Sequence, residues 1–272
     1  MSRVAFADLP AAARQAVTRH TGPVRTVRPA WGGQHAALAV LLATQAGPVY
    51  VKGVPADTPQ ADAQMREAAV APHLRTAVPR LLWQVDAGGW LLSGWQAVSG
   101  RQADYRSRED LHLVQSLMEQ VQREKITAGV ELGTAVERWG PYADEGAAEA
   151  FAGDVLLQTE WAPEQVLVGP GRQAWVVEWA WPTRGAGWID PYMWALRLME
   201  AGHSAATAVE WACEVPSWRD ADPAALRAFA AAVARVWHEI ATKEPAGGNL
   251  HTAVQAAELW AYLALDPRAS HC

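Results

Sequence analysis

The chain has 272 residues, of which 50% are hydrophobic and 19% are charged, and its formal net charge is −6. This composition is that of a globular protein with a substantial core, and it excludes a disordered chain. The net acidity, with no run of basic residues, argues against a nucleic-acid partner. Because no apolar run approaches the ~18 residues that cross a bilayer, no membrane partner is expected either.

The N-terminus and the cysteines predict a cytoplasmic protein. The first ten residues, MSRVAFADLP, lack the hydrophobic stretch of a secretory signal. Cys213 and Cys272 are too few for a disulfide framework, so we expect reduced thiols.

The first third of the chain predicts a sheet with few helices. Apolar residues that alternate between glycines and prolines predict strands, and the Gly-Gly pair before Trp90 suits a hairpin turn. Helix-forming residues at helical spacing predict two helices. The strands are predicted within 24–54, 78–87 and 89–98, and the helices over 8–20 and 59–75.

Helical patterns dominate after residue 100. Residues 153–168 predict a hairpin of two apolar runs around a polar loop, and 173–182 predict a further strand. The expected fold class is α+β with two lobes, namely a β-rich N-lobe over 1–95 with one regulatory-type helix and a mainly α-helical C-lobe over 96–272. Helices are predicted over 109–125, 145–151, 191–203, 205–213, 223–243 and 249–264.

Polar groups suited to phosphoryl transfer recur along the chain. Lys52 lies in the predicted strand VYVKGV of a chain with only three lysines against 20 arginines, which indicates that a compact ammonium is needed there. Phosphoryl transfer uses such groups because its catalysis is mostly placement and charge neutralisation. The other candidates are Glu67 on the next helix, then Gln158, Glu160 and Gln165 in the loop QTEWAPEQ, and Glu178 at the end of VVE.

The order and spacing of these groups resemble the aminoglycoside phosphotransferase family of the protein-kinase-like fold, and the resemblance covers nearly the whole chain. The resemblance is carried by VYVKGVPADTPQADAQMREAAV, LLQTEWAPEQVLV and VVEWAWPTRGAGWIDP. The family's catalytic loop has the pattern H-x-D-x-x-x-x-N, and Gln158, Glu160 and Gln165 fall on its three positions with unaltered spacing. Glu178 falls on the metal-binding aspartate of the next strand, and Asp190 on an aspartate that braces the loop.

The resemblance also implies ATP and Mg²⁺ as cofactors. Lys52 and Glu67 fall on the family's strand-lysine and helix-glutamate pair. A turn with backbone N–H groups that can approach phosphates is offered by Gly32, Gly33 and His35, although a lone glycine pair indicates only a turn. The implied partner is a small-molecule or peptide ligand in a cleft between the lobes or in the C-lobe. The sequence does not predict the oligomeric state.

Departures from the family pattern predict weakened catalysis. Glu160, Gln165 and Glu178 each carry the functional group one methylene further out than the family residues, and Gln158 replaces a histidine. A displacement of roughly 1 Å can cost ~100-fold in rate, and Mg²⁺ requires near-ideal octahedral geometry. We therefore expect a degenerate phosphotransferase, a pseudokinase that binds Mg²⁺ poorly and has a binding or accessory role in specialised-metabolite biosynthesis or resistance.

Other interpretations stay open. The chain is an active ATP-dependent O-phosphotransferase if Glu160 is the base and Gln165 and Glu178 hold Mg²⁺, and a third possibility is that the cleft serves different chemistry. Gln158 and Gln165 could instead be polar hairpin residues. Glu67 could be a helix-surface acid that pairs with a nearby arginine, and Glu178 a simple strand-end carboxylate. Trp161 and Trp179 flank the predicted site, although aromatic residues in such a unit are more often core.

Overall fold

The protein has a mixed α+β fold. The structure, a computed structural model, describes residues 3–30, 35–74, 77–125, 130–244 and 248–265. Its contacts divide the chain into two compact units, where the sequence analysis predicted lobes of 1–95 and 96–272. The first unit comprises Met1–Gln102, Ile126–Val130 and Glu164–Trp181, and the second comprises Ala103–Lys125, Glu131–Pro163 and Pro182–Cys272.

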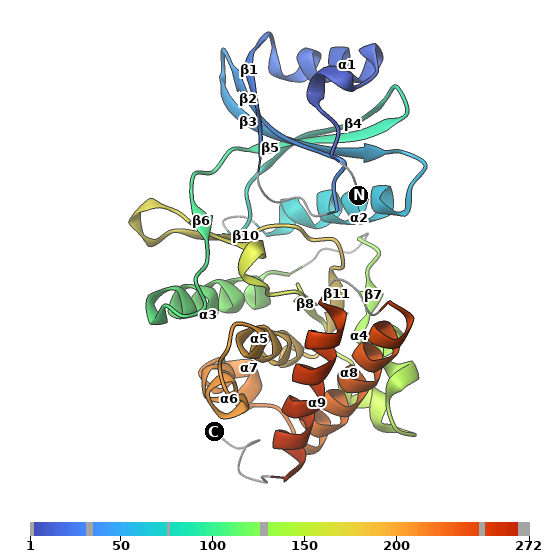
Figure 1. The fold of residues 1–272 in the computed structure, drawn as a ribbon, viewed down its shortest axis with the longest axis vertical. Helices are drawn as coiled ribbons and strands as arrows, with labels where there is room; N and C mark the ends of the chain where they lie inside the picture. The colour runs from blue at the N-terminus through green and yellow to red at the C-terminus, as the bar shows by residue number, and fades with distance from the viewer. Residues whose placement is uncertain (1–2, 31–34, 75–76, 126–129, 245–247, 266–272) are drawn as a thin grey trace. The chain divides into compact units, whose positions relative to one another are not determined.

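An antiparallel five-stranded sheet is the base of the first unit, with the order β1-β2-β3-β5-β4 (Figure 1). Gly88 and Gly89 turn the chain between the last two strands, and both have a positive φ, of 63° and 76°, that glycine adopts at little cost. The strands predicted in this region therefore form. They are β1 (Val24–Pro29), β2 (Leu38–Thr44), β3 (Gly47–Pro55), β4 (Leu81–Ala87) and β5 (Trp90–Gln96).

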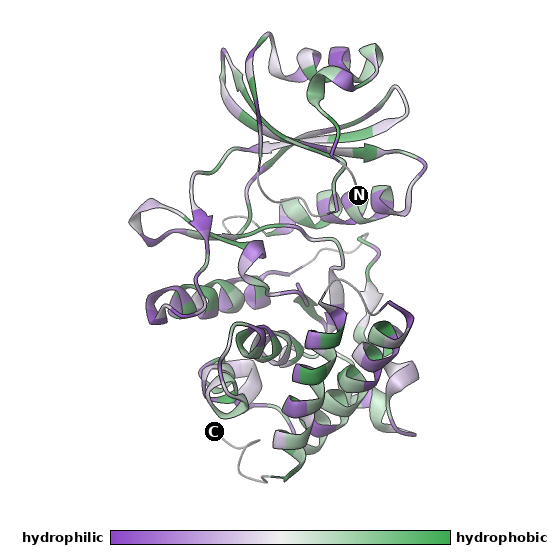
Figure 2. Cartoon of the chain, in the orientation of Figure 1, coloured by the Kyte–Doolittle hydropathy of each residue, from purple (hydrophilic) through white to green (hydrophobic). Residues whose placement is uncertain are grey.

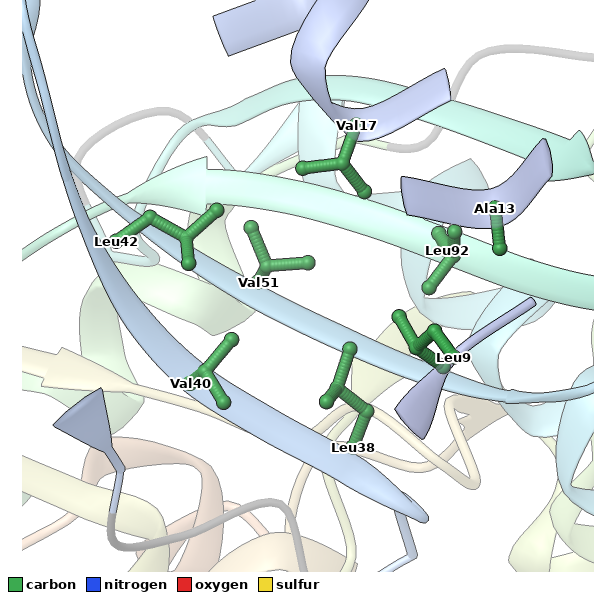
Figure 3. Close-up of a cluster of buried hydrophobic side chains, with 8 residues drawn as sticks. All are labelled: Leu9, Ala13, Val17, Leu38, Val40, Leu42, Val51 and Leu92. Carbon is green, nitrogen blue, oxygen red and sulfur yellow. The ribbon is translucent and has the colours of Figure 1, made fainter. Parts of the chain in front are cut away.

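One face of this sheet packs against α1 (Ala11–Thr21), which follows the 3-10 turn η1 (Phe6–Asp8). Alternate residues of a strand point to the same face, so every second residue of β2 contributes to this core. Figure 3 shows how the side chains meet. The cluster contains Leu9, Ala13, Val17, Leu38, Val40, Leu42, Val51 and Leu92.

The opposite face of the sheet carries α2 (Pro59–Val70), which begins with a proline at its first turn and continues into η2 (Ala71–His73). Ala61 of this helix packs against Val54 and Leu91 of the sheet. The period of two along β3 places Tyr50 and Lys52 on this face, away from the core around α1. The polar residues of β3 therefore share a face with α2.

A three-stranded sheet, of order β10-β9-β6, completes the first unit. It contains β6 (Arg101–Gln102), β9 (Val166–Val168) and β10 (Ala174–Val176), with η5 (Pro163–Gln165) and η6 (Pro170–Arg172) between them. The strand predicted over 173–182 is shorter than expected, because Glu178 has a φ of 65°, which is outside the β region.

The hairpin predicted over 153–168 does not form. Its first apolar run, β8 (Val155–Leu157), pairs with β11 (Thr183–Gly185) in the second unit. Its second run, β9, pairs with β10 and β6 in the first unit. The polar loop between them therefore connects two sheets, which alternation of apolar residues cannot reveal.

Helices form most of the second unit, around a sheet of order β7-β11-β8 whose remaining strand is β7 (Gly133–Thr134). Ser107, Ser204 and Asp222 start helices by accepting backbone N–H groups, as N-cap residues do. In Figure 2, hydrophilic and hydrophobic residues alternate along α3, whereas α5 is largely hydrophobic. The helices are α3 (Arg108–Arg123), α4 (Ala135–Trp139), α5 (Ile189–Glu200), α6 (Ala205–Cys213), α7 (Pro216–Arg219), α8 (Pro223–Lys243) and α9 (Asn249–Leu265), with η3 (Gly140–Tyr142) and η4 (Ala147–Phe151).

Two expectations about this unit are wrong. The helix predicted over 145–151 is the short 3-10 turn η4, which begins after Gly146 in the left-handed region. Cys213 is disulfide-bonded, where a reduced thiol was expected. In the part of the chain that the structure describes, no helix is long and apolar enough to cross a membrane.

Candidate functional site

Lys52 and Glu67 form a buried ion pair in the first unit. The Nζ atom of Lys52 on β3 donates to Oε2 of Glu67 on α2, and the two residues are only 7% and 6% exposed. The ammonium also lies 5.3 Å from the ring centroid of Trp95 on β5, within the range of a cation–π contact. The lysine is therefore held in one orientation by a carboxylate and an aromatic ring.

Tyr50 is a polar group near this pair that the sequence analysis did not single out. Its backbone is opposite Trp95 in the register of β3 and β5, two residues before Lys52. Burial raises the pKa of the Tyr50 phenol, and the negative charges of Glu178 and Glu67 raise it further. The phenol is therefore a neutral hydroxyl, able to donate a hydrogen bond at physiological pH.

A cavity of about 610 Å³ lies within the first unit, on the α2 face of the sheet. Lys52, Glu67 and Glu178 contribute to its wall. Residues 97–100, which follow β5, form another part of the wall and have no regular secondary structure. The volume and the mixed lining are those of a small-molecule site. The aromatic and aliphatic parts of the lining include Tyr50, Trp95, Trp179, Leu41, Leu167 and Val176.

The pairing of β9 with β10 brings Gln165 and Glu178 to the same end of these strands. The backbone N–H of Val177 donates to the carbonyl of Gln165 over 2.8 Å, one residue before Glu178. Gln165 and Glu178 are 5% and 9% exposed. Glu178 also has a φ of 65°, a strained conformation for a residue that is not glycine, and such strain often occurs at functional sites.

In the second unit, Asp190 holds the start of the loop after β8. Its carboxylate accepts the backbone N–H groups of Gln158 at 3.1 Å and Thr159 at 2.8 Å. Asp190 is fully buried, and burial raises its pKa from 3.8 to about 6, against the lowering effect of the two N–H groups. The resemblance implied this bracing role, and the geometry here is one that can perform it.

Two further contacts fix Thr159 and Glu160. The backbone N–H of Glu160 donates to the side-chain oxygen Oε1 of Gln158 over 2.6 Å. Thr159 has a φ of 67°, an outlier for a β-branched residue, and its hydroxyl accepts a 2.8 Å hydrogen bond from Arg138 on α4. Burial lowers the pKa of Arg138, whereas the charges of Glu160 and Asp190 raise it.

Tyr105 holds the same loop at Trp161, one residue after Glu160. Its hydroxyl donates to the carbonyl of Trp161 over 2.5 Å, and the Tyr105 ring makes an edge contact with Trp194 at 6.5 Å. Nε2 of His203 lies 2.6 Å from the Tyr105 carbonyl. Glu160 therefore lies in a loop whose backbone is held on both sides.

The remaining predicted site residues are placed as follows. Gly32 and Gly33 lie outside the described residues. His35 is exposed and lines a small cavity of about 20 Å³ together with Lys52, Glu67 and Glu178. Trp161 and Trp179 are buried. Gln158 and Glu160 belong to the second unit, whereas Lys52, Glu67, Gln165 and Glu178 belong to the first.

No protein-family model and no curated protein matches the sequence. Solved structures with the same fold include an aminoglycoside phosphotransferase from Alicyclobacillus acidocaldarius, at 12% identity and a TM-score of 0.63, over 94% of this chain and 96% of that one. Choline kinase LicA from Streptococcus pneumoniae has 10% identity and a TM-score of 0.61, with 92% and 98% covered. A spectinomycin phosphotransferase, solved with ADP and spectinomycin, has 9% identity and a TM-score of 0.62, with 94% and 97% covered. The chain therefore has the protein-kinase-like α+β fold of aminoglycoside phosphotransferases and choline kinase.

Proposed function

We propose that this protein is a degenerate phosphotransferase that binds ATP or a similar ligand and has lost efficient phosphoryl transfer. Its role is then binding or accessory, in specialised-metabolite biosynthesis or resistance. The observation that carries the proposal is the cavity of about 610 Å³ whose wall contains the buried pair of Lys52 and Glu67. A similar fold in a phosphotransferase solved with ADP supports a nucleotide as the ligand.

The cavity offers a nucleotide three kinds of contact. Tyr50 and Trp95 provide aromatic surface against which a flat base can pack. Lys52 provides a fixed positive charge for a phosphate oxygen, and a charge-assisted hydrogen bond of this kind is strong. The neutral Tyr50 hydroxyl adds a donor close to the carboxylates of Glu67 and Glu178.

The loss of transfer is proposed from the lengths of three side chains. Gln165 and Glu178 end in oxygen atoms, the ligand type that Mg²⁺ takes, so they are the residues that would hold the ion and let it neutralise phosphate charge. Each reaches one methylene further than the family residue at its position, as does Glu160. Three displacements of roughly 1 Å, each able to cost ~100-fold in rate, together oppose efficient transfer.

Calorimetric titration with ATP tests the binding part of this proposal. We expect saturable binding that Lys52→Met weakens by ~10-fold or more, because a charge-assisted contact is lost. Lys243→Met is the matched control, since Lys243 is exposed on α8 and pairs with Glu239 on the surface. Absence of binding, or equal binding by the Lys52→Met protein, would overturn the proposal.

An active phosphotransferase is the second candidate function, and the way the loop around Glu160 is held in place favours it. Asp190, Gln158 and Tyr105 bind backbone groups at and on both sides of Glu160, and Arg138 holds the Thr159 hydroxyl, so the loop is fixed as a catalytic base requires. In this case Glu160 would accept the proton of a substrate hydroxyl while the phosphoryl group moves from ATP to that oxygen.

ATP consumption in the presence of amino sugars and amino alcohols separates the two candidates. An active enzyme transfers phosphate, loses activity with Glu160→Ala and keeps it with Glu149→Ala, a substitution at an exposed position of η4. A degenerate enzyme shows no transfer, and the combined changes Glu160→Asp, Gln165→Asn and Glu178→Asp raise its turnover.

A further inference from the structure

Arg66 on α2 binds the chain segment that carries Glu178. Residues 177–181, which follow β10 in the first unit, belong to no helix or strand. The Nε atom of Arg66 donates to the carbonyl of Ala180 over 3.2 Å, across 114 positions of sequence. Its guanidinium also lies 5.0 Å from the ring centroid of Trp181, within the range of a cation–π contact. One side chain therefore contacts two successive residues of this segment.

Glu178 lies between this contact and a second one. On its N-terminal side, the backbone N–H of Val177 donates to the carbonyl of Gln165 over 2.8 Å. On its C-terminal side, Arg66 binds the carbonyl of Ala180. Glu178 itself has a φ of 65°, and a residue other than glycine keeps such a conformation only where surrounding contacts enforce it. Arg66 therefore supplies a constraint on one side of the strained residue.

The helix that carries Arg66 is itself fixed to the sheet. Glu67, the next residue of α2, accepts from Lys52 on β3. Nε2 of Gln64 donates to the carbonyl of Leu91 on β5 over 3.2 Å. Successive residues of a helix point about 100° apart, so α2 reaches the sheet through Glu67 and the segment 177–181 through Arg66. The Arg66 side chain therefore extends from a rigid base.

Glu178 and Lys52 face the same spaces. Together with Glu67 they line both the cavity of about 610 Å³ and the small cavity of about 20 Å³. The charges of the three side chains, +1, −1 and −1, sum to −1. Arg66 is not among the residues that line either cavity. Its effect on a ligand must therefore pass through the segment that it binds.

We propose that Arg66 is a positioning residue that keeps the carboxylate of Glu178 in the cavity wall. Held there, this carboxylate repels a phosphate group that approaches Lys52 without a metal ion, because like charges at short range in a partly buried site interact strongly. Loss of the Arg66 contacts lets residues 177–181 relax and the carboxylate turn toward water. The effect on phosphate binding rests on the proposed binding of ATP, whereas the positioning of Glu178 does not.

A double-mutant cycle, measured by calorimetric titration with ATP in the absence of Mg²⁺, tests this proposal. Glu178→Gln should bind ATP ~10-fold more tightly than the parent, because a repelling charge is removed. In the Arg66→Met protein the same change should alter the affinity by less than ~2-fold, because the carboxylate no longer lies in the wall. A general structural effect of Arg66→Met would instead leave the ratio at its parental value.

Two further variants complete the cycle. Arg19→Met, at an exposed position of α1, is the matched control and should keep the parental ratio. Trp181→Ala removes the ring beneath the guanidinium at a side chain that is 48% exposed, so it should fold normally and reduce the ratio. A ratio near one in the parent, or a parental ratio in both Arg66→Met and Trp181→Ala, overturns the proposal.

Hydrogen exchange without ligand separates a failure of this proposal from a failure of ATP binding. In Arg66→Met the peptides that cover residues 177–181 should exchange ~10-fold faster or more, whereas peptides from α1 keep the parental rate. Faster exchange in a protein that binds no ATP would support the positioning role and contradict the proposed function alone. Unchanged exchange of residues 177–181 would overturn the positioning role, whatever the affinity for ATP.

Discussion

Asp190 accepts the backbone N–H of Thr159 over 2.8 Å, and Thr159 has a φ of 67° that a β-branched residue rarely adopts. The strained residue directly precedes Glu160, so the buried carboxylate stabilises the conformation that presents this side chain. Backbone strain persists where surrounding contacts enforce it. In this loop the enforcing contacts come from Asp190 at the backbone N–H groups and from Arg138 at the Thr159 hydroxyl.

The stability of the protein should fall as Asp190 ionises. The folded pKa is about 6 against an ordinary 3.8, so the native state binds this proton more tightly than the unfolded chain does. The stabilisation that comes from this proton is complete below about pH 4 and is lost as the pH rises through about 6. The free energy of unfolding should fall by on the order of 3 kcal/mol over this range. Urea unfolding of the parent and Asp190→Asn from pH 4 to 7 should show the parent losing stability relative to the variant.

Asp144→Asn is the control for this linkage, because Asp144 pairs with Arg235 on the surface. Its effect should stay within ~0.5 kcal/mol across the same pH range. A difference between parent and Asp190→Asn that is constant with pH would contradict the raised pKa of Asp190.

Arg138→Met should loosen the loop. The change removes the hydrogen bond to Thr159, so we expect the free energy of unfolding to fall by ~2 kcal/mol. It also removes a positive charge near Asp190, so the pKa of Asp190 should rise further. Chemical denaturation measures the first effect, and the pH profile of stability the second. Arg123→Met, at an exposed position of α3, should change neither quantity. An Arg138→Met protein as stable as the parent would show that the contact between Arg138 and Thr159 does not hold the loop.

Lys52 and Glu67 should show strong coupling in a double-mutant cycle. Lys52→Met leaves Glu67 buried without its cation, which should cost ~3–5 kcal/mol. Adding Glu67→Gln should recover most of that loss, because the uncompensated charge disappears. The double variant should still bind ATP poorly, which distinguishes a ligand contact from a folding defect. Additive single effects would show that the pair is not a functional unit.

Gly94→Ala should destabilise the first unit. A Cβ atom at Gly94 would lie 2.2 Å from Cε2 of Trp83, and the Trp83 ring is stacked on His20 at 4.9 Å, so it cannot move away freely. We expect the free energy of unfolding, measured by chemical denaturation, to fall by ~1–3 kcal/mol. Gly133→Ala is the control, since a Cβ atom at Gly133 would meet nothing within 4 Å beyond its chain neighbours; equal effects of the two changes would disprove the packing argument.

Local signals predicted most of the regular elements. The helices predicted over 205–213 and 223–243 appear with those bounds, because Ser204 and Asp222 cap them and their apolar periodicity is clear. The strands of two or three residues, β7 and β11, are too short for a periodic signal. The false hairpin over 153–168 arose because β8 and β9 look like partners in sequence but pair elsewhere.

The candidate site was predictable only in part. Motif spacing singled out Lys52 and Glu67, and the structure brings them together. Tyr50 could have been found from strand alternation, since it shares a face with Lys52. No local signal marks Arg138 or Tyr105, because their contacts with Thr159 and Trp161 span 21 and 56 residues of sequence. Such contacts depend on the tertiary fold.

A crystal structure with Mg²⁺ and a non-hydrolysable ATP analogue tests the central claim most directly. The account predicts the nucleotide in the cavity beside Lys52, Tyr50 and Trp95, without a metal ion that binds both Gln165 and Glu178. An octahedral Mg²⁺ with ~2.0–2.1 Å bonds to both of these side chains would contradict it, because longer ligands would then have rebuilt the site that transfer requires.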